Sequence, residues 1–301
     1  MTIIHPGSIN PMTVGTRGSP ARGFSPIGSP PAGTGSYPNE PVGYNRLFEH
    51  NFEIIPDVGN GVMGTWTNES GPSNLSVVTG SNPDGNDIFD VQTEYPISHS
   101  SGNAPVHYNV NQVESGSRVT EQYFSWWLKV EGTDFENQQV GTKLCYFGYG
   151  ESSAGALNQG YLIFVNSSGS QQLESNFYLD FWQQGTIGND TGDEEKLGRN
   201  VGSGPQWTVG SYHQLEPLMI ENTSGSYYPS ADGTFKLWVD GNLTHNYTNI
   251  EWHEPSASLG FLGWKYDPVW GGVGGTKTRA DYWRSAHVYM SGKVGTQLDG
   301  L

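Results

Sequence analysis

The stretch that decides the fold is residues 231–247, ADGTFKLWVDGNLTHNY. Its apolar and polar residues alternate, which is the period of a β-strand with one buried face. Asp240-Gly241 then interrupts the alternation, and Asp-Gly between two alternating runs is a strong signal for a two-residue hairpin turn. The stretch therefore predicts two antiparallel strands with one side against a core.

The rest of the chain repeats this pattern. With 42 Gly, 10 Trp and 16 Tyr among 301 residues, and only 15% charged residues, the composition suits short strands joined by many turns. Turn signals such as Pro83-Asp84-Gly85 and Gly271-Gly272 separate the runs. The sequence therefore predicts an all-β sandwich or barrel. Strands are expected at 48–55, 62–67, 74–79, 87–93, 105–110, 118–130, 142–149, 160–165, 176–183, 211–221, 234–239, 242–248, 258–265 and 281–290.

Several predicted strands have two unlike faces. One is plain hydrocarbon, as in Phe124, Trp126 and Leu128, and is a core face. The other mixes aromatic rings with polar groups; it suits a sugar, whose C–H face stacks on rings, or equally a protein partner. In the last strand, Ser285 is expected on this second face. The candidate glycan- or partner-binding residues are Tyr123, Trp127, Lys129, Tyr178, Asp180, Trp182, Lys236, Trp238, His287 and Tyr289.

Residues 1–45 differ from the rest of the chain. They are rich in Pro, Gly and Ser and show no period of 2 or 3.6, so they have no face to bury. We predict an extended N-terminal arm that makes assembly contacts with a neighbouring subunit, followed by one β-domain over 46–301. The acidic stretch 185–206 is expected to be a long loop without regular structure.

Charge and cysteine content exclude several classes of protein. A formal net charge of -16 would repel a phosphate backbone, so nucleic-acid binding is not expected. Cys145 is the single cysteine, so no intrachain disulfide can form, and it is expected to be a buried apolar residue. No apolar stretch approaches the roughly 20 residues that span a bilayer. The first residues lack the pattern of a Sec signal peptide.

Three stretches resemble the concanavalin A-like lectin/glucanase jelly rolls, in particular the polysaccharide-lyase-like or laminin-G-like branch. They are 123–150, where Lys143-Leu144 follows a Gly; 212–247, which contains Trp-hydrophobic-Asp-Gly; and 271–292, a Gly-Gly loop with a closing strand. The resemblance implies an antiparallel jelly-roll β-sandwich over 46–301. It says little about activity, because this fold hosts lectins, hydrolases, lyases and structural modules.

A glycosidase of this fold carries paired carboxylates, and no Glu-x-Asp-x-Glu triplet occurs here. A lyase needs a cation or amide to neutralise a uronate carboxylate and a Tyr or His to take the neighbouring proton. The Arg-x-Glu-x-Arg strand of one lyase group is absent, and Cys145-Tyr146 stands where the resemblance leads to Pro-Gly. If the chain is a lyase, its candidate residues are Lys143, Tyr146, Tyr178, His213 and Arg284.

No cofactor is predicted. Carboxylates that could bind Ca²⁺ occur at 82–87 (NPDGND) and 189–195 (NDTGDEE), but neither stretch has the spacing of a twelve-residue calcium loop. Plain acidic turns are therefore favoured over metal sites, and the histidines show no zinc spacing. The weak calcium candidates are Asp84, Asp87, Asp190 and Asp193.

The main functional prediction is a non-enzymatic surface or structural protein of a multi-subunit assembly, such as a capsid-decoration or tail-associated protein of a bacteriophage virion. Its second face could also bind glycan. The alternative is a polysaccharide lyase (depolymerase) that cleaves uronate-containing glycans by β-elimination. Expected partners are neighbouring subunits, through residues 1–45, and cell-surface or extracellular polysaccharide; neither nucleic acid nor membrane is expected. The predicted location is a virion or another extracellular assembly, after synthesis in the cytoplasm without a Sec signal.

Overall fold

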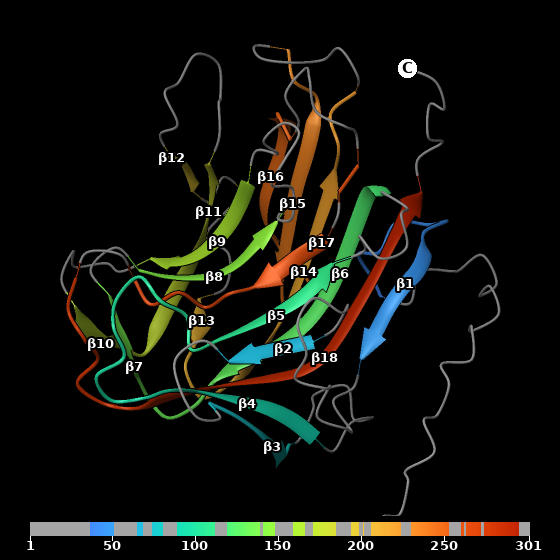
Figure 1. Cartoon of the computed structure of the whole chain (residues 1–301). Helices are drawn as coiled ribbons and strands as arrows, with labels where there is room; N and C mark the ends of the chain where they lie inside the picture. Colours follow the sequence, from blue (N-terminus) through green and yellow to red (C-terminus); the bar gives the residue numbers. More distant parts are fainter. Residues whose placement is uncertain are drawn as a thin grey trace, which may run out of the picture. The chain divides into compact units, whose positions relative to one another are not determined.

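The computed structural model describes residues 37–50, 65–68, 74–80, 89–111, 119–138, 141–147, 159–165, 171–184, 194–198, 201, 206–223, 230–252, 260–261, 263–271 and 274–294. All of them belong to one compact unit, residues 32–301. In these ranges the chain forms 18 β-strands, labelled in Figure 1, and no helix. No helix able to cross a membrane is therefore found in the same ranges.

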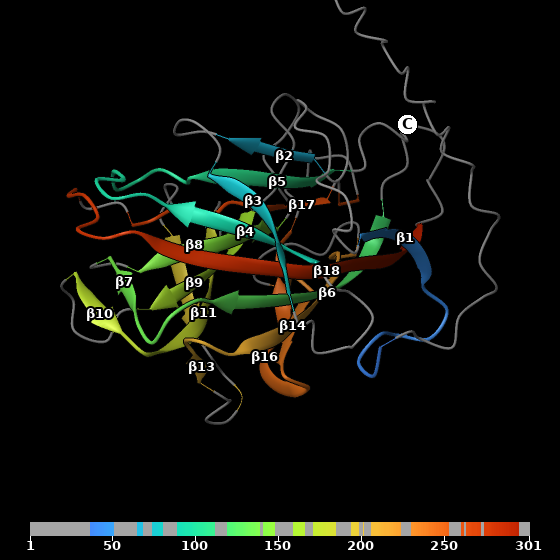
Figure 2. The same cartoon turned by 90° about the horizontal axis from the view of Figure 1, so that it is seen from below.

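Two antiparallel sheets make up the sandwich. In sheet A the strand order is β16-β15-β14-β6-β18-β4-β3, and β1 also pairs with β18. Figure 2 shows the long strands β6 and β18 side by side. The bounds in sheet A are β16 (Asn242–Ile250), β15 (Gly233–Val239), β14 (Tyr212–Ile220), β6 (Val119–Val130), β18 (Asp281–Val294), β4 (Phe89–Tyr95), β3 (Leu75–Thr79) and β1 (Asn45–His50).

Sheet B has the order β12-β11-β9-β8-β17-β5-β2, and β13 also pairs with β11. A separate two-stranded ribbon pairs β10 (Gln172–Glu174) with β7 (Phe135–Asn137). The bounds in sheet B are β12 (Glu194–Gly198), β11 (Asn176–Gln184), β9 (Gln159–Val165), β8 (Thr142–Phe147), β17 (Gly263–Tyr266), β5 (Val106–Asn111), β2 (Thr65–Asn68) and β13 (Trp207–Thr208).

Aromatic side chains fill the space between the two sheets. Phe181 of sheet B stacks on Phe235 of sheet A with ring centroids 3.8 Å apart, and Trp126 packs against Trp264 at 4.9 Å. These residues alternate along their strands with outward-facing ones, as the sequence predicts. The predicted hydrocarbon faces of 122–130, 177–183 and 235–239 are all confirmed as core.

Three details differ from the sequence-based predictions. The stretch 185–206 is not wholly irregular, because β12 forms within it and pairs with β11. A β-bulge between Ala286 and Val288 shifts β18 by one residue, so Ser285 is paired with the core residue Leu128 and is fully buried. The short strands β7, β10 and β13 were not predicted, because two or three residues carry no measurable period.

Candidate functional site

The outer face of sheet A, opposite the core, carries cross-strand rows of polar and aromatic side chains. Lys129 of β6 is paired with both Arg284 of β18 and Tyr212 of β14, so these three residues form one row. In the next row, Trp127 of β6 is paired with Gln214 of β14. All five are half-buried, so two rings, two cations and an amide remain partly accessible on this face. We call this group the open rows.

The charges in the open rows balance one another. Arg284 contacts Glu131 through Nε and lies 3.5 Å from Asp90 through its terminal nitrogen. Tyr212 donates a hydrogen bond to Asp90, and the Lys129 ammonium lies 5.4 Å from the Tyr212 ring centre. Burial raises the pKa of the Asp90 carboxyl and of the Tyr212 phenol. Two cations and two carboxylates therefore surround one protonated phenol.

Further along the same face lies an aromatic cluster separate from the main core. Its centre is formed by Tyr123 of β6, Leu218 of β14 and Tyr289 of β18, with Trp238 of β15 packed beside them. The Tyr123 hydroxyl donates a 2.5 Å hydrogen bond to Glu216 of β14. We call these five residues the shelf.

The chain's own residues 37–44 lie over the shelf. The Tyr37 ring packs 4.8 Å from the Tyr289 ring, and its hydroxyl lies 3.2 Å from Nδ1 of His287. The Tyr289 hydroxyl donates a 2.8 Å hydrogen bond to Glu40. Tyr289 is therefore only 3% exposed, although it projects from the outer face of its sheet.

Two further side chains hold the same segment. Asn39 donates a 2.9 Å hydrogen bond to the second carboxylate oxygen of Glu216, and Tyr44 donates one of 2.6 Å to Glu121 of β6. Burial, then the bond to Glu121, raises the pKa of Tyr44. The phenol thus stays a donor over the whole range of physiological pH.

The outer face of sheet B carries a second, smaller cluster. Trp182 of β11 packs with Ile163 of β9, and Tyr146 of β8 lies against them. The Lys143 ammonium lies 5.8 Å from the centre of the Tyr146 ring. Lys265 of β17, which is paired with Tyr146 and forms a 2.8 Å ion pair with Asp267, was not among the predicted site residues.

The structure therefore separates the predicted site residues into two groups on opposite faces of the molecule's sandwich. None of these roles is tested by their placement, and each stays a prediction. Those on sheet A are Tyr123, Trp127, Lys129, Lys236, Trp238, Arg284, His287 and Tyr289. Those on sheet B are Lys143, Tyr146, Tyr178, Asp180 and Trp182.

His213 joins neither group. It is paired with the core residue Leu128 and lies with its ring 4.7 Å from Trp207. Nδ1 is 2.6 Å from Asp240, and Nε2 accepts a 3.0 Å hydrogen bond from the Thr208 amide. Nε2 thus engages the β13–β14 turn and Nδ1 the β15–β16 turn, and neither nitrogen faces Lys143, Tyr146 or Arg284 of the predicted lyase set.

Sequence reasoning missed Tyr212, Gln214 and Glu216, which complete both parts of the outer face of sheet A. The signal was present: in YHQLEPLMI, residues 212–220, every second side chain of β14 belongs to that face. Residues 37–44 carry no comparable signal, since their contacts are made with strands more than 70 residues away in the chain.

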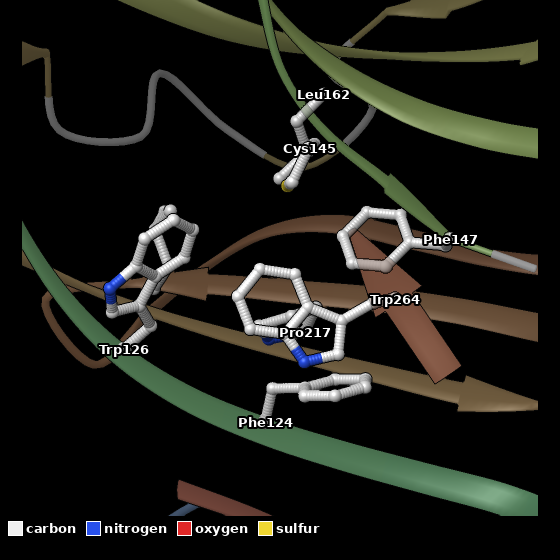
Figure 3. Close-up of a pocket in the computed structure, with 8 residues that line it drawn as sticks. Phe124, Trp126, Cys145, Phe147, Leu162, Pro217 and Trp264 are labelled. Atoms are coloured by element: carbon white, nitrogen blue, oxygen red, sulfur yellow. The ribbon is translucent and has the colours of Figure 1, made fainter. Parts of the chain in front are cut away.

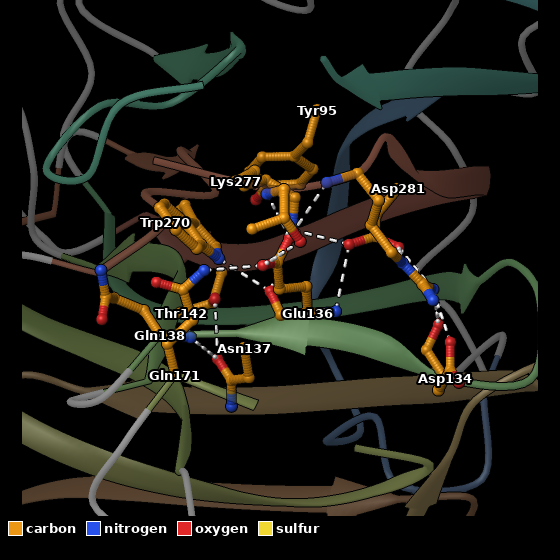
Figure 4. Close-up of polar contacts among 12 residues, drawn as sticks. Tyr95, Asp134, Glu136, Asn137, Gln138, Thr142, Gln171, Trp270, Lys277 and Asp281 are labelled. Atoms are coloured by element: carbon orange, nitrogen blue, oxygen red, sulfur yellow. Dashed lines mark hydrogen bonds and ion pairs between the residues drawn. The ribbon is translucent and has the colours of Figure 1, made fainter. Parts of the chain in front are cut away.

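A buried polar network was also missed, and it is structural. Lys277 is completely buried, 2.6 Å from Asp281, and donates a 2.9 Å hydrogen bond to the Glu136 carbonyl (Figure 4). Rings of Phe135, Trp270 and Tyr95 surround its ammonium at 4.4, 5.1 and 5.3 Å. The network joins β7 to the segment before β18, and within it the Lys277 side chain is 0% exposed.

A small cavity lies between the sheets (Figure 3). Its free volume of ≈ 10 Å³ is about that of a single water molecule, and its walls are apolar, so we assign it no ligand. The lining residues are Phe124, Trp126, Cys145, Phe147, Leu162, Leu215, Pro217 and Trp264. Cys145, one of them, is buried as predicted, and burial raises the pKa of its thiol.

Metal binding has no support among the residues that the structure describes. They contain no group of three or more His, Cys, Asp or Glu side chains arranged to hold an ion. The calcium candidates Asp84, Asp87, Asp190 and Asp193 lie outside the described residues.

No protein-family model matches the sequence, and no curated protein matches it either. The fold is similar to that of the alginate lyase Aly36B, in a mutant bound to alginate tetrasaccharide: the TM-score is 0.52 at 14% identity, covering 80% of this chain and 98% of that one. It is also similar to the alginate lyase vAL-1 from Chlorella virus, with a TM-score of 0.50 at 16% identity, covering 72% of this chain and 88% of that one. The chain thus has a concanavalin A-like jelly-roll fold.

Proposed function

We propose that this protein binds a uronate-containing polysaccharide along the outer face of sheet A. The observation that carries the proposal is the pair of open rows, in which Trp127 lies beside the cations Lys129 and Arg284 on a continuous face of three strands. An indole offers a flat apolar surface for a sugar ring, and the cations offer charge-assisted hydrogen bonds to a carboxylate.

Two further features support this choice of face. The half-buried Gln214, whose side-chain N–H donates a 2.8 Å hydrogen bond to the buried Ser125, supplies a neutral amide for sugar hydroxyls next to the ring and the cations. The two similar jelly rolls are named as alginate lyases, and alginate is a polymer of uronates. The equivalent group on sheet B is more apolar.

Cleavage by β-elimination is the second candidate function, and the likeness to alginate lyases favours it. Tyr212 lies next to Asp90 and to the two cations, where a base could take a proton from a sugar whose carboxylate is neutralised by Lys129 and Arg284. However, burial raises the pKa of Tyr212, which disfavours the phenolate that would accept this proton. This direction of the Tyr212 pKa shift is the reason that we place binding before catalysis.

Binding is tested by titrating the full chain with polymers of uronates and with a neutral glucan of similar length. We expect the uronate polymer to bind, and the Trp127→Ala and Lys129→Met variants each to weaken binding at least tenfold, about 1.4 kcal/mol. The matched control is Tyr178→Ala, which removes an aromatic ring that is 38% exposed on sheet B. Equal affinity for the neutral glucan, or a loss at Tyr178 instead of Trp127, would contradict the assignment.

Cleavage is tested with the same polymers by following the ultraviolet absorbance of unsaturated product ends. A lyase that uses the open rows should lose this signal in Tyr212→Phe, which keeps the ring but removes the hydroxyl. Binding without any unsaturated product would leave a binding protein and eliminate the second candidate. The virion location and the assembly contacts of residues 1–45 remain our proposals, separate from both tests.

A further inference from the structure

Residues 37–44, which we call the strap, cover half of the face to which the proposed function assigns the polysaccharide. The strap lies over the shelf, and the open rows lie next to the shelf on the same three strands, β6, β14 and β18. From Lys129 to Tyr123 the face extends over six residues of β6, roughly 20 Å at 3.3 Å per residue. A polymer lying along this face therefore meets the strap.

The contacts of the strap are those that an acidic sugar would make. Tyr37 places a flat ring against the ring of Tyr289, and Glu40 places a carboxylate on the Tyr289 hydroxyl. Asn39 bonds to Glu216 through a neutral N–H, as a sugar hydroxyl could. A ring, a carboxylate and a hydrogen-bond donor thus occupy the shelf together.

Side chains make these contacts with the shelf. The backbone hydrogen bond that the structure gives to the strap lies within it, from the Glu40 amide to the Tyr37 carbonyl at 3.1 Å. Val42 of the strap is 87% exposed, whereas Glu40 and Tyr44 are 8% and 6% exposed, so some side chains of the strap pack on the sheet and others face solvent. A segment held by side-chain contacts can leave its site at a lower cost in free energy than a strand paired through its backbone.

We infer that the strap is an intramolecular competitor of the polysaccharide: it occupies the shelf in the free protein and must leave before the polymer can use the whole face. This inference rests on the proposed function and adds regulation to it. A site that is accessible only in a fraction of molecules has an apparent affinity reduced by that fraction. If the strap is in place nine-tenths of the time, weakening it should tighten binding about tenfold.

The test uses the full chain with Tyr37→Ala and Glu40→Ala combined, which removes the ring and the carboxylate from the shelf. We expect this variant to bind a uronate polymer at least tenfold more tightly than the wild type. Adding Tyr289→Phe, which deletes the freed hydroxyl, should reverse much of the gain. Val42→Ala is the matched control, because it changes an exposed strap residue and should leave affinity unchanged.

Unchanged affinity in the double variant, with wild-type binding intact, would overturn the inference and leave the proposed function standing. If neither protein binds the polymer, the proposed function fails, and the competition fails with it. A second measurement on the wild type avoids any effect of substitutions on folding. Chymotrypsin should cleave after Tyr44, which is 6% exposed in the docked strap, faster when the polymer is added. A rate that the polymer does not change would also overturn the inference.

Discussion

At the scale of single residues, Lys277 shows how this fold accommodates a charge inside its core. A buried lysine is normally unfavourable, and burial does lower the pKa of this one. Asp281 offsets that cost at 2.6 Å, and the same carboxylate also accepts bonds from Arg279 and from the Glu136 amide. The pair joins the start of β18 to β7, so one buried contact fixes two segments that are distant in the sequence.

Replacing Lys277 by methionine should therefore destabilise the protein by about 3 kcal/mol, because Asp281 loses its buried partner. The matched control is Lys293→Met, whose ammonium pairs with Glu121 at 3.1 Å but is 61% exposed. That change should stay within about 0.5 kcal/mol of wild type. The free energies of unfolding are measured by urea denaturation, and equal values for the two variants would refute this role of the Lys277 pair.

At the scale of strands, alternation alone was enough to predict the main elements and their core faces. Phe235, Leu237 and Val239 lie in the core as the period of two requires, and Lys236 and Trp238 face outward. It was not enough for β18, where the bulge at Ala286–Val288 moves Ser285 into the core side. A bulge depends on the partner strand as well as on its own residues, so local patterning cannot place it.

Pro217 shows a second limit of local patterning. It lies inside β14, a strand with neighbours on both sides, where a missing N–H is normally unfavourable. Pairing between β14 and β6 is recorded at Leu215 and resumes at Leu218, so the proline falls in a gap of this ladder. Whether a proline is tolerated at a given position depends on which strands lie on either side of it. The order of strands is a property of the whole sheet, so local patterning cannot predict it.

The β15–β16 hairpin allows a test at the same scale. Both Asp240 and Gly241 have positive φ, 51° and 73°, as a type I′ turn requires. A Cβ on Gly241 would meet no atom within 4 Å, so Gly241→Ala should cost only the strain of the left-handed backbone, about 1 kcal/mol. Gly241→Asn should cost less, since Asn tolerates this conformation. Equal losses for Ala and Asn in thermal or urea unfolding would show that the backbone is not the cause.

At the scale of the whole molecule, the candidate site depends on contacts that no stretch of sequence contains. The predicted aromatic residues proved to lie on two sheets, because alternation assigns a residue to a face but does not say which sheet it joins. Likewise, Tyr37 and Glu40 reach Tyr289 across some 250 residues of chain. The composition of residues 1–45 predicts an extended arm, but it does not indicate that Tyr37 and Glu40 pack on the shelf. That contact becomes evident only in the folded chain.

The net charge of the molecule leads to a final prediction about how a polymer approaches the open rows. A chain with formal charge -16 repels a polyuronate over a Debye length, about 30 Å in 10 mM salt and about 8 Å in 150 mM. The cations Lys129 and Arg284 do not reverse this repulsion, because Asp90 and Glu131 balance them in the same rows. Raising the salt from 10 to 150 mM should therefore increase the association rate constant, in contrast to the decrease seen for a cationic groove.

Stopped-flow mixing with a uronate polymer measures this rate directly. A rate that falls as salt rises would mean that local cations dominate the approach, and that the balance of charge assigned to the open rows is incorrect.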